Sequence, residues 1–121
     1  MRVGPEVDWQ AFAADWEAGW NSHDLDRIMA HYDDDIVFRS QKAVALAGTG
    51  ELRGKDALWA YWAAALERQP DLRFEVTQVF EGHDMCVIVY RNHRGVMAAE
   101  TLWFEGGAQA VRASACHART V

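Results

Sequence analysis

The order of its patterns constrains this chain most: the first half has helical periodicity and the second half has strand-like segments joined by short turns. Four segments rich in β-branched and aromatic residues, 72–80, 85–92, 96–104 and 110–117, are separated by EGHD, HRG and EGG. Each separator is typical of a turn between strands. Helices followed by consecutive antiparallel strands predict an α+β domain in which a curved sheet wraps around the helices.

The first half of the chain contains three candidate helices. Residues 8–20 carry one apolar stripe at helical spacing, formed by Trp9, Phe12, Ala13, Trp16 and Trp20. Asp24 is a suitable N-cap for a second helix over 25–32, which the acidic residues 33–35 are expected to end before a strand at 36–38. A loop of sequence AGTGELRG then precedes a third helix over 55–69, which Pro70 stops.

Length, charge and cysteine content limit the class of protein. A chain of 121 residues is expected to form one domain over 1–121, with residues 1–6 as a loose tail. The net charge of −6 argues against nucleic acid as a partner. No apolar run approaches the roughly 20 residues that span a membrane, and the start lacks the core of a signal peptide. Cys86 and Cys116 form no CxxC motif, so a cytoplasmic location is expected.

Several segments together resemble one known superfamily. WNSHDLDRIMAHYDDDIVF, LRGKDALWAYW, YRNHRG, AAETLWF and RASACHA are similar to the nuclear transport factor 2-like superfamily, in particular its SnoaL-like branch. That branch includes ketosteroid isomerases, polyketide cyclases, scytalone dehydratase and limonene epoxide hydrolase. The resemblance covers about residues 8–118. It implies a cone, in which a strongly bent, mostly antiparallel sheet encloses an apolar cavity with three helices, and a homodimer formed through the outer face of the sheet.

An ungapped comparison with the isomerase pattern tests the reaction that this resemblance suggests. The isomerase uses a carboxylate base opposite an oxyanion hole formed by a tyrosine and a protonated aspartic acid. The base position falls on Ser40, the tyrosine position on Trp16 and the acid position on Glu100. Serine cannot act as the base, and the tryptophan indole can donate a hydrogen bond but has no ionisable hydroxyl, so the steroid isomerase mechanism is not expected here. The epoxide hydrolase mechanism is not expected either, because no second inward carboxylate accompanies Glu100.

Two residues are candidate catalytic groups. Glu100 shares one face of its strand with Ala98, Leu102 and Phe104. The resemblance places this face toward the cavity, where burial raises the pKa of a carboxyl group and makes it suitable as a general acid or base. The alternative is a rim carboxylate paired with Arg91 or Arg112. His117 ends the last strand and can meet Glu100 as an acid–base pair. The alternative is a structural histidine near the C-terminus.

The candidate ligand pocket is mainly aromatic. The expected lining residues are Trp16, Trp20, Tyr32, Phe38, Ser40, Trp59, Trp62 and Leu102. A tryptophan stripe on helices is also typical of a core, so these side chains either fill the cone or line it. A lining of this kind suits a flat hydrophobic substrate such as a polyketide or terpenoid.

Other patterns indicate no cofactor and no metal. The chain has no GxGxxG or GKS/T motif. Asp33, Asp34 and Asp35 follow His31 but are interpreted as solvated, because three adjacent carboxylates cannot face one ion. His23, His83 and His93 fall in expected turns and are interpreted as exposed.

Trp103 and Thr101 point away from the cavity face on the same strand. A tryptophan on an outer sheet face predicts a homodimer interface, and the alternative is that the chain's own tail covers it.

Three functions therefore remain open at this point. The first is a cofactor-independent isomerase, cyclase or dehydratase for a small hydrophobic molecule, with Glu100 and His117 transferring protons. The second is a protein that binds such a molecule without turnover. The third is an association domain whose cone is filled by its own aromatic side chains.

Overall fold

The computed structural model describes residues 7–119 and contains four helices and six strands. The helices are α1 (Trp9–Ser22), α2 (Leu25–Met29), α3 (Ala43–Ala47) and α4 (Lys55–Arg68). The strands are β1 (Tyr32–Ser40), β2 (Glu51–Arg53), β3 (Phe74–Gly82), β4 (Met85–Asn92), β5 (Met97–Phe104) and β6 (Ala110–His117). The expected loose tail, residues 1–6, lies outside the described residues.

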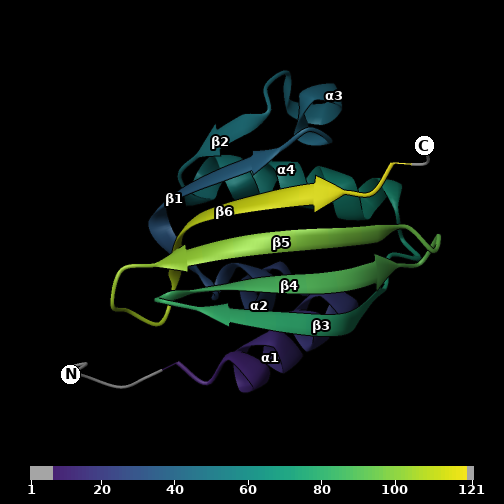
Figure 1. Ribbon diagram of the computed structural model, residues 1–121. Helices are drawn as coiled ribbons and strands as arrows, with labels where there is room; N and C mark the ends of the chain where they lie inside the picture. Colours follow the sequence, from purple (N-terminus) through teal and green to yellow (C-terminus); the bar gives the residue numbers. More distant parts are fainter. Residues whose placement is uncertain (1–6, 120–121) are drawn as a thin grey trace.

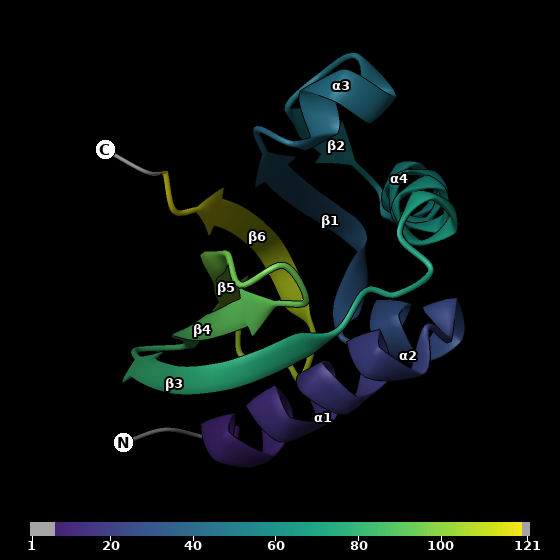
Figure 2. The same ribbon diagram turned by 90° about the vertical axis from the view of Figure 1, so that its right-hand side faces the viewer.

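The strands form one curved sheet in the order β2-β1-β6-β5-β4-β3. β1 and β6 are parallel, and all other neighbours are antiparallel. Figure 1 shows the sheet face-on with the helices behind it, and Figure 2 shows that the sheet bends around them. α1 lies along β3 and α4 lies along β1 and β2. The predicted α+β cone is therefore confirmed.

The first helix follows directly from the sequence pattern. The Asp8 carboxylate accepts a hydrogen bond of 3.1 Å from the Ala11 amide, which satisfies a free donor of the first turn. His23 ends the helix in the left-handed conformation with φ of 60°. The expected stripe is mostly buried, and Phe12 packs partly buried against it. α1 therefore delivers its tryptophans to the interior of the bent sheet.

Two expectations about the segment before α4 are wrong. The second helix ends at Met29 instead of residue 32, and Tyr32 already begins β1. The acidic residues 33–35 lie within that strand, at the register shift between Tyr32 and Val37, and the pairs on both sides of them hold the strand to β6 despite their low intrinsic preference for strands.

The segment expected to be an irregular loop contains β2, with α3 just before it. Five helical residues and three strand residues are too short to show a periodic pattern in a sequence. The sheet therefore has six strands and the first half has four helices, one strand and one helix more than the patterns predict.

Neither cysteine forms a disulfide: Cys86 is buried and Cys116 is exposed, and both are free. Within residues 7–119, the longest apolar stretches of the helices fall short of what is needed to cross a membrane.

Candidate functional site

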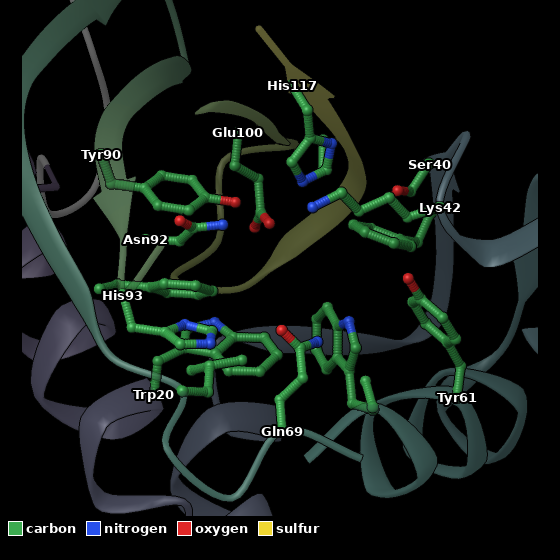
Figure 3. A pocket seen from close by; sticks show the side chains of 16 residues that line it. Trp20, Ser40, Lys42, Tyr61, Gln69, Tyr90, Asn92, His93, Glu100 and His117 are labelled. Carbon is green, nitrogen blue, oxygen red and sulfur yellow. The ribbon is translucent and has the colours of Figure 1, made fainter. Parts of the chain in front are cut away.

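A cavity lies between α1, α4 and the concave face of the sheet (Figure 3). Its volume is about 80 Å³, several times the ~10–15 Å³ that one water molecule requires. The cone is therefore not completely filled by its own aromatic side chains. This is about half the ~150 Å³ of a cavity that binds benzene, so a larger ligand has to extend from the cavity toward solvent, to which it is partly open.

The apolar part of the wall consists of aromatic rings from both layers. The rings of Trp20 and Trp62 meet edge to face with centroids 4.8 Å apart, which is a favourable geometry for aromatic pairs. Phe38 packs on Trp62 at 5.3 Å, and Phe74 packs on Tyr90 at 4.5 Å. These contacts hold the rings in fixed orientations, so the cavity presents a preformed surface to a flat ligand.

Glu100 is the only carboxyl group among the described residues that line the cavity. It lies on β5, where the burial pattern alternates strictly, and it is 3% exposed. Oε2 of Glu100 accepts a hydrogen bond of 2.5 Å from the Tyr32 hydroxyl, which in turn accepts one of 3.2 Å from Nε1 of Trp16. Figure 3 shows the carboxyl group pointing into the cavity.

The surroundings of Glu100 favour its neutral form. Burial raises its pKa to about 7, although hydrogen bonds from Tyr32 and Trp16 act in the opposite direction. Within residues 7–119 no cation forms an ion pair with it. Arg91 pairs with Glu75 at 3.1 Å, and the Arg112 guanidinium lies over the Trp103 ring at 4.9 Å. The alternative of a rim carboxylate paired with either arginine is therefore wrong.

His117 and Lys42 line the cavity near Glu100. Figure 3 shows the imidazole of His117 and the ammonium of Lys42 on the same side of the cavity, both directed toward its interior. Burial lowers the pKa of His117, and the charge of Lys42 lowers it further. Burial and the charge of Arg94 lower the pKa of Lys42. No hydrogen bond joins Glu100 and His117 in the described part of the chain, so a ligand would have to bridge them.

The residues predicted for the site fall into three groups. Those that line the cavity are Trp20, Phe38, Ser40, Trp62, Glu100 and His117. Those that are buried but do not line it are Trp16, Tyr32 and Leu102. Of these, Trp16 and Tyr32 act on the site through their hydrogen bonds to each other and to Glu100.

Trp59 does not belong to the site, contrary to the prediction. It is 40% exposed and lies beside Asp26 and Lys55 in a separate surface groove. The buried residues of α4 are Leu58, Trp62 and Leu66, at a spacing of four. Trp59 follows the first of these by one position, which turns its side chain toward solvent.

Several lining residues were missed. They are Lys42, Tyr61, Gln69, Tyr90, Asn92 and His93. His93 was expected to be exposed in its turn, but its side chain is only 9% exposed. The shared strand face of Tyr90 and Asn92 was the one available signal. Lys42, Gln69 and His93 lie just outside helices and strands, and Tyr61 lies on α4 outside its row of buried residues. Only the tertiary fold brings these four side chains to the cavity.

The outer face of the sheet carries Thr101 and Trp103, both partly buried. The groove beside Trp103 is lined by charged residues that include Arg39, Glu51 and Arg112. This face is separate from the cavity.

Comparisons with known proteins agree with this architecture. A family model for the SnoaL-like domain matches residues 13–119. No curated protein sequence matches the chain. A solved SnoaL-like protein of unknown function from Burkholderia thailandensis is 39% identical, with a TM-score of 0.88, covering 95% of this chain and 100% of that one.

Two more distant structures share the fold alone. A candidate polyketide cyclase from Sinorhizobium meliloti is 13% identical with a TM-score of 0.72, covering 88% of this chain and 94% of that one. TerC, crystallised with polyporic acid, is 15% identical with a TM-score of 0.74, covering 89% and 90%.

Proposed function

The chain belongs to the SnoaL-like family, and from this premise we propose that it catalyses a proton transfer on a small molecule held in the cavity, with Glu100 as the proton carrier. The reaction is a cofactor-independent isomerisation, cyclisation or dehydration. His117 is the second candidate for proton transfer, and Lys42 joins it as a group that touches the ligand.

One observation carries this proposal: a single carboxyl group, 3% exposed and without an ion pair among the described residues, lies on the wall of an aromatic cavity. A carboxyl group in such a place is costly to ionise and exchanges a proton readily near neutral pH. The two arginines considered as structural partners, Arg91 and Arg112, are engaged with Glu75 and Trp103 instead.

The chemical step that fits is removal of a proton from a carbon next to a carbonyl group. Ionised Glu100 takes the proton, the C–H electron pair forms a C=C bond, and the carbonyl electrons move to oxygen. Return of the proton to another carbon gives an isomerisation. Attack by the enolate on a second carbonyl gives a cyclisation. The positive charge of Lys42 on the cavity wall lowers the cost of the negative charge that develops in the cavity.

Tyr32 and Trp16 are positioning residues in this scheme. The Tyr32 hydroxyl donates to Oε2 and is itself fixed by the Trp16 indole, so one carboxylate oxygen is engaged and the other is left for the substrate. The structures of TerC with polyporic acid and of the candidate polyketide cyclase support a small organic substrate, although their likeness to this chain extends to the fold alone.

The test is exchange of carbon-bound protons for deuterium, followed by NMR in D₂O on small ketones such as acetophenone. We expect the wild-type protein to accelerate exchange and Glu100→Gln to abolish the acceleration while keeping the fold. The matched control is Glu105→Gln, which changes an exposed residue of the following turn and should exchange like wild type. Equal rates for wild type and Glu100→Gln would remove Glu100 from the mechanism.

A non-catalytic binding function is the second candidate. The isomerase pattern has its base at the position of Ser40, which is 5% exposed on the cavity wall. Serine cannot act as that base, and this favours binding without a reaction. A binding protein would release its ligand chemically unchanged. Neither the wild type nor the two glutamate variants would then accelerate deuterium exchange into the ligand. The cavity of about 80 Å³ argues against the association-domain hypothesis, which predicts a completely filled cone.

We also propose that the chain forms a homodimer through the outer sheet face around Thr101 and Trp103. The partly buried Trp103 under the Arg112 guanidinium supports an interface at this face. Two free cysteines support the proposed cytoplasmic location, because free thiols are typical of reducing compartments.

A further inference from the structure

The cavity contains two side chains whose buried nitrogen atoms have no hydrogen-bond partner. These are Nε1 of Trp20 and both ring nitrogens of His93. Asp71 lies near His93, but its Oδ1 is 3.6 Å from Nε2, beyond hydrogen-bond distance, and its side chain is 74% exposed. Figure 3 shows the His93 imidazole and the Trp20 indole next to each other in the view, on the side of the cavity below Tyr90.

Unpartnered buried nitrogens are uncommon because their desolvation is not compensated. Among the described residues, every buried side-chain nitrogen or oxygen without a partner belongs to Trp20 or His93. Both residues line the same cavity. Elsewhere in the described chain the buried polar side chains are satisfied, as the hydrogen bonds of Trp16, Tyr32 and Glu100 illustrate. The unsatisfied groups are therefore concentrated where a ligand can reach them.

The structure holds both side chains in place. The Asn92 carboxamide oxygen accepts hydrogen bonds of 2.9 Å from the amides of Arg94 and Val96, which fixes the turn that carries His93. The Trp20 ring is enclosed by Trp62 at 4.8 Å and Phe74 at 5.3 Å. Both residues line the cavity, so a ligand atom inside it can reach the unpartnered nitrogens.

We propose that Trp20 and His93 form a hydrogen-bonding subsite for an oxygen atom of the ligand. The indole N–H is a donor only, so the ligand atom that it binds is an acceptor. A neutral imidazole offers one further donor and one acceptor. These donors call for an acceptor on the ligand, such as a carbonyl or carboxylate oxygen. The cavity volume of about 80 Å³ and the aromatic walls favour a small, flat molecule.

This inference rests on the proposed function only in taking the cavity as the ligand site, and it names the substrate class. Glu100 reaches the cavity from β5, whereas Trp20 comes from α1 and His93 from the turn between β4 and β5. One small carbonyl compound can thus meet the subsite with its oxygen while its carbon skeleton faces Glu100.

The first experiment compares two flat molecules of the same shape, acetophenone and α-methylstyrene, which differ in having C=O or C=CH₂. Benzoate is the third probe, and it distinguishes a charged oxygen from a neutral one. We expect acetophenone or benzoate to bind about 2- to 10-fold more tightly than α-methylstyrene, as one added hydrogen bond predicts. The indole N–H proton signal of Trp20, identified by its loss in Trp20→Phe, should move downfield only with the oxygen-bearing probes.

Two variants test the residues individually. His93→Leu removes both unpartnered nitrogens, so we expect an unchanged or higher melting temperature together with weaker binding of the oxygen-bearing probe. Its matched control is His83→Leu, at an exposed turn position. Trp20→Phe should reduce acetophenone binding to the level of α-methylstyrene, and Trp59→Phe, on the surface, should not. Should Trp20→Phe fail to fold, His93→Leu still decides the question.

Equal affinities for acetophenone, benzoate and α-methylstyrene would overturn the subsite, as would an unmoved Trp20 signal on saturation or the absence of binding by all three probes. A lower melting temperature of His93→Leu with unchanged ligand affinity would also overturn it. Because binding is measured without turnover, Glu100→Gln should still bind acetophenone. Loss of the catalytic role of Glu100 therefore leaves this test intact. If acetophenone binds but no more tightly than α-methylstyrene, the subsite is lost and the exchange assay remains intact.

Discussion

The hydroxyl of Tyr32 donates a hydrogen bond of 2.5 Å to Oε2 of Glu100, although the two residues are 68 positions apart in the sequence. Tyr32 is the first residue of β1 and Glu100 lies in the middle of β5, with β6 between these strands. Both side chains are almost completely buried. This bond links the only cavity-lining carboxyl group of the described chain to the interior of the protein, and it lowers the pKa of Glu100 against the larger effect of burial.

Removing the Tyr32 hydroxyl is expected to raise the pKa of Glu100 above about 7, because the hydrogen bond from Tyr32 holds that pKa down against burial. Tyr32→Phe also removes the hydroxyl that accepts the 3.2 Å hydrogen bond from the Trp16 indole, which should cost about 1–3 kcal/mol of stability. The shift is measurable by NMR titration of a ¹³C-labelled glutamate side chain.

Tyr61→Phe is the matched control for Tyr32→Phe. Tyr61 also lines the cavity but makes no contact with Glu100. Tyr61→Phe should therefore leave the pKa of Glu100 unchanged. An equal pKa shift in Tyr61→Phe and Tyr32→Phe would show that loss of the Tyr32 hydrogen bond is not the cause.

Lys42→Met is expected to raise the pKa of His117. Burial lowers that pKa first, and the nearby positive charge of Lys42 lowers it further; the variant removes only the second cause, so part of the depression should remain. The titration of the His117 ring proton by NMR measures this effect. Lys55→Met is the control, since Lys55 lies near Asp34 and away from the cavity. An unchanged pKa of His117 in Lys42→Met would contradict the placement of the Lys42 charge close to His117.

The protonation of Glu100 also predicts how stability depends on pH. Its pKa is raised from 4.5 to about 7 by folding, so the folded state holds a proton that the unfolded state releases. This contribution to stability is fully present below pH 4.5 and is lost as pH rises through about 7. The loss should amount to about 3 kcal/mol for this one group.

Chemical denaturation of wild type and Glu100→Gln between pH 4.5 and 8 measures this loss. The difference in unfolding free energy between the two proteins should change by about that amount, with the variant gaining relative stability at high pH. A pH-independent difference would mean that Glu100 titrates normally.

Trp103→Ala is expected to convert the proposed homodimer to monomers, because it removes the largest apolar side chain of the outer sheet face. Sedimentation velocity of the wild type and the variant measures this directly. Trp59→Ala removes a tryptophan that is 40% exposed elsewhere on the surface and should leave the dimer intact. A monomeric wild-type protein would contradict the proposed interface.

The fold could be predicted from the sequence because its strongest signals are local. The stripe of α1 and the turn-separated strands β3 to β6 depend on neighbouring residues, and their positions in the structure agree with the patterns within a few residues. Pairing of β1 with β6 depends on the tertiary fold. The sequence pattern therefore misassigned residues 30–35, where the acidic run disfavours a strand.

The candidate site was only partly predictable for the same reason. Alternation along the strand gave the face that Glu100 shares, the family resemblance turned that face toward the cavity, and the structure has Glu100 there. The hydrogen bond from Tyr32, the approach of Lys42 and the burial of His93 join residues from different elements. Trp59 and Trp62 share one sequence pattern yet separate into exposed and buried positions, because the exact rotation of α4 is set by packing.

The measurement that tests the central claim most directly is the pH dependence of deuterium exchange into acetophenone, with the rate of Glu100→Gln subtracted at each pH. Glu100 acts as a base only when ionised, so the wild-type rate should rise with pH and level off above a midpoint near 7. A midpoint near 4.5, the ordinary value for a glutamate, or a difference from Glu100→Gln that is zero at every pH, would contradict the assignment of Glu100 as the proton carrier.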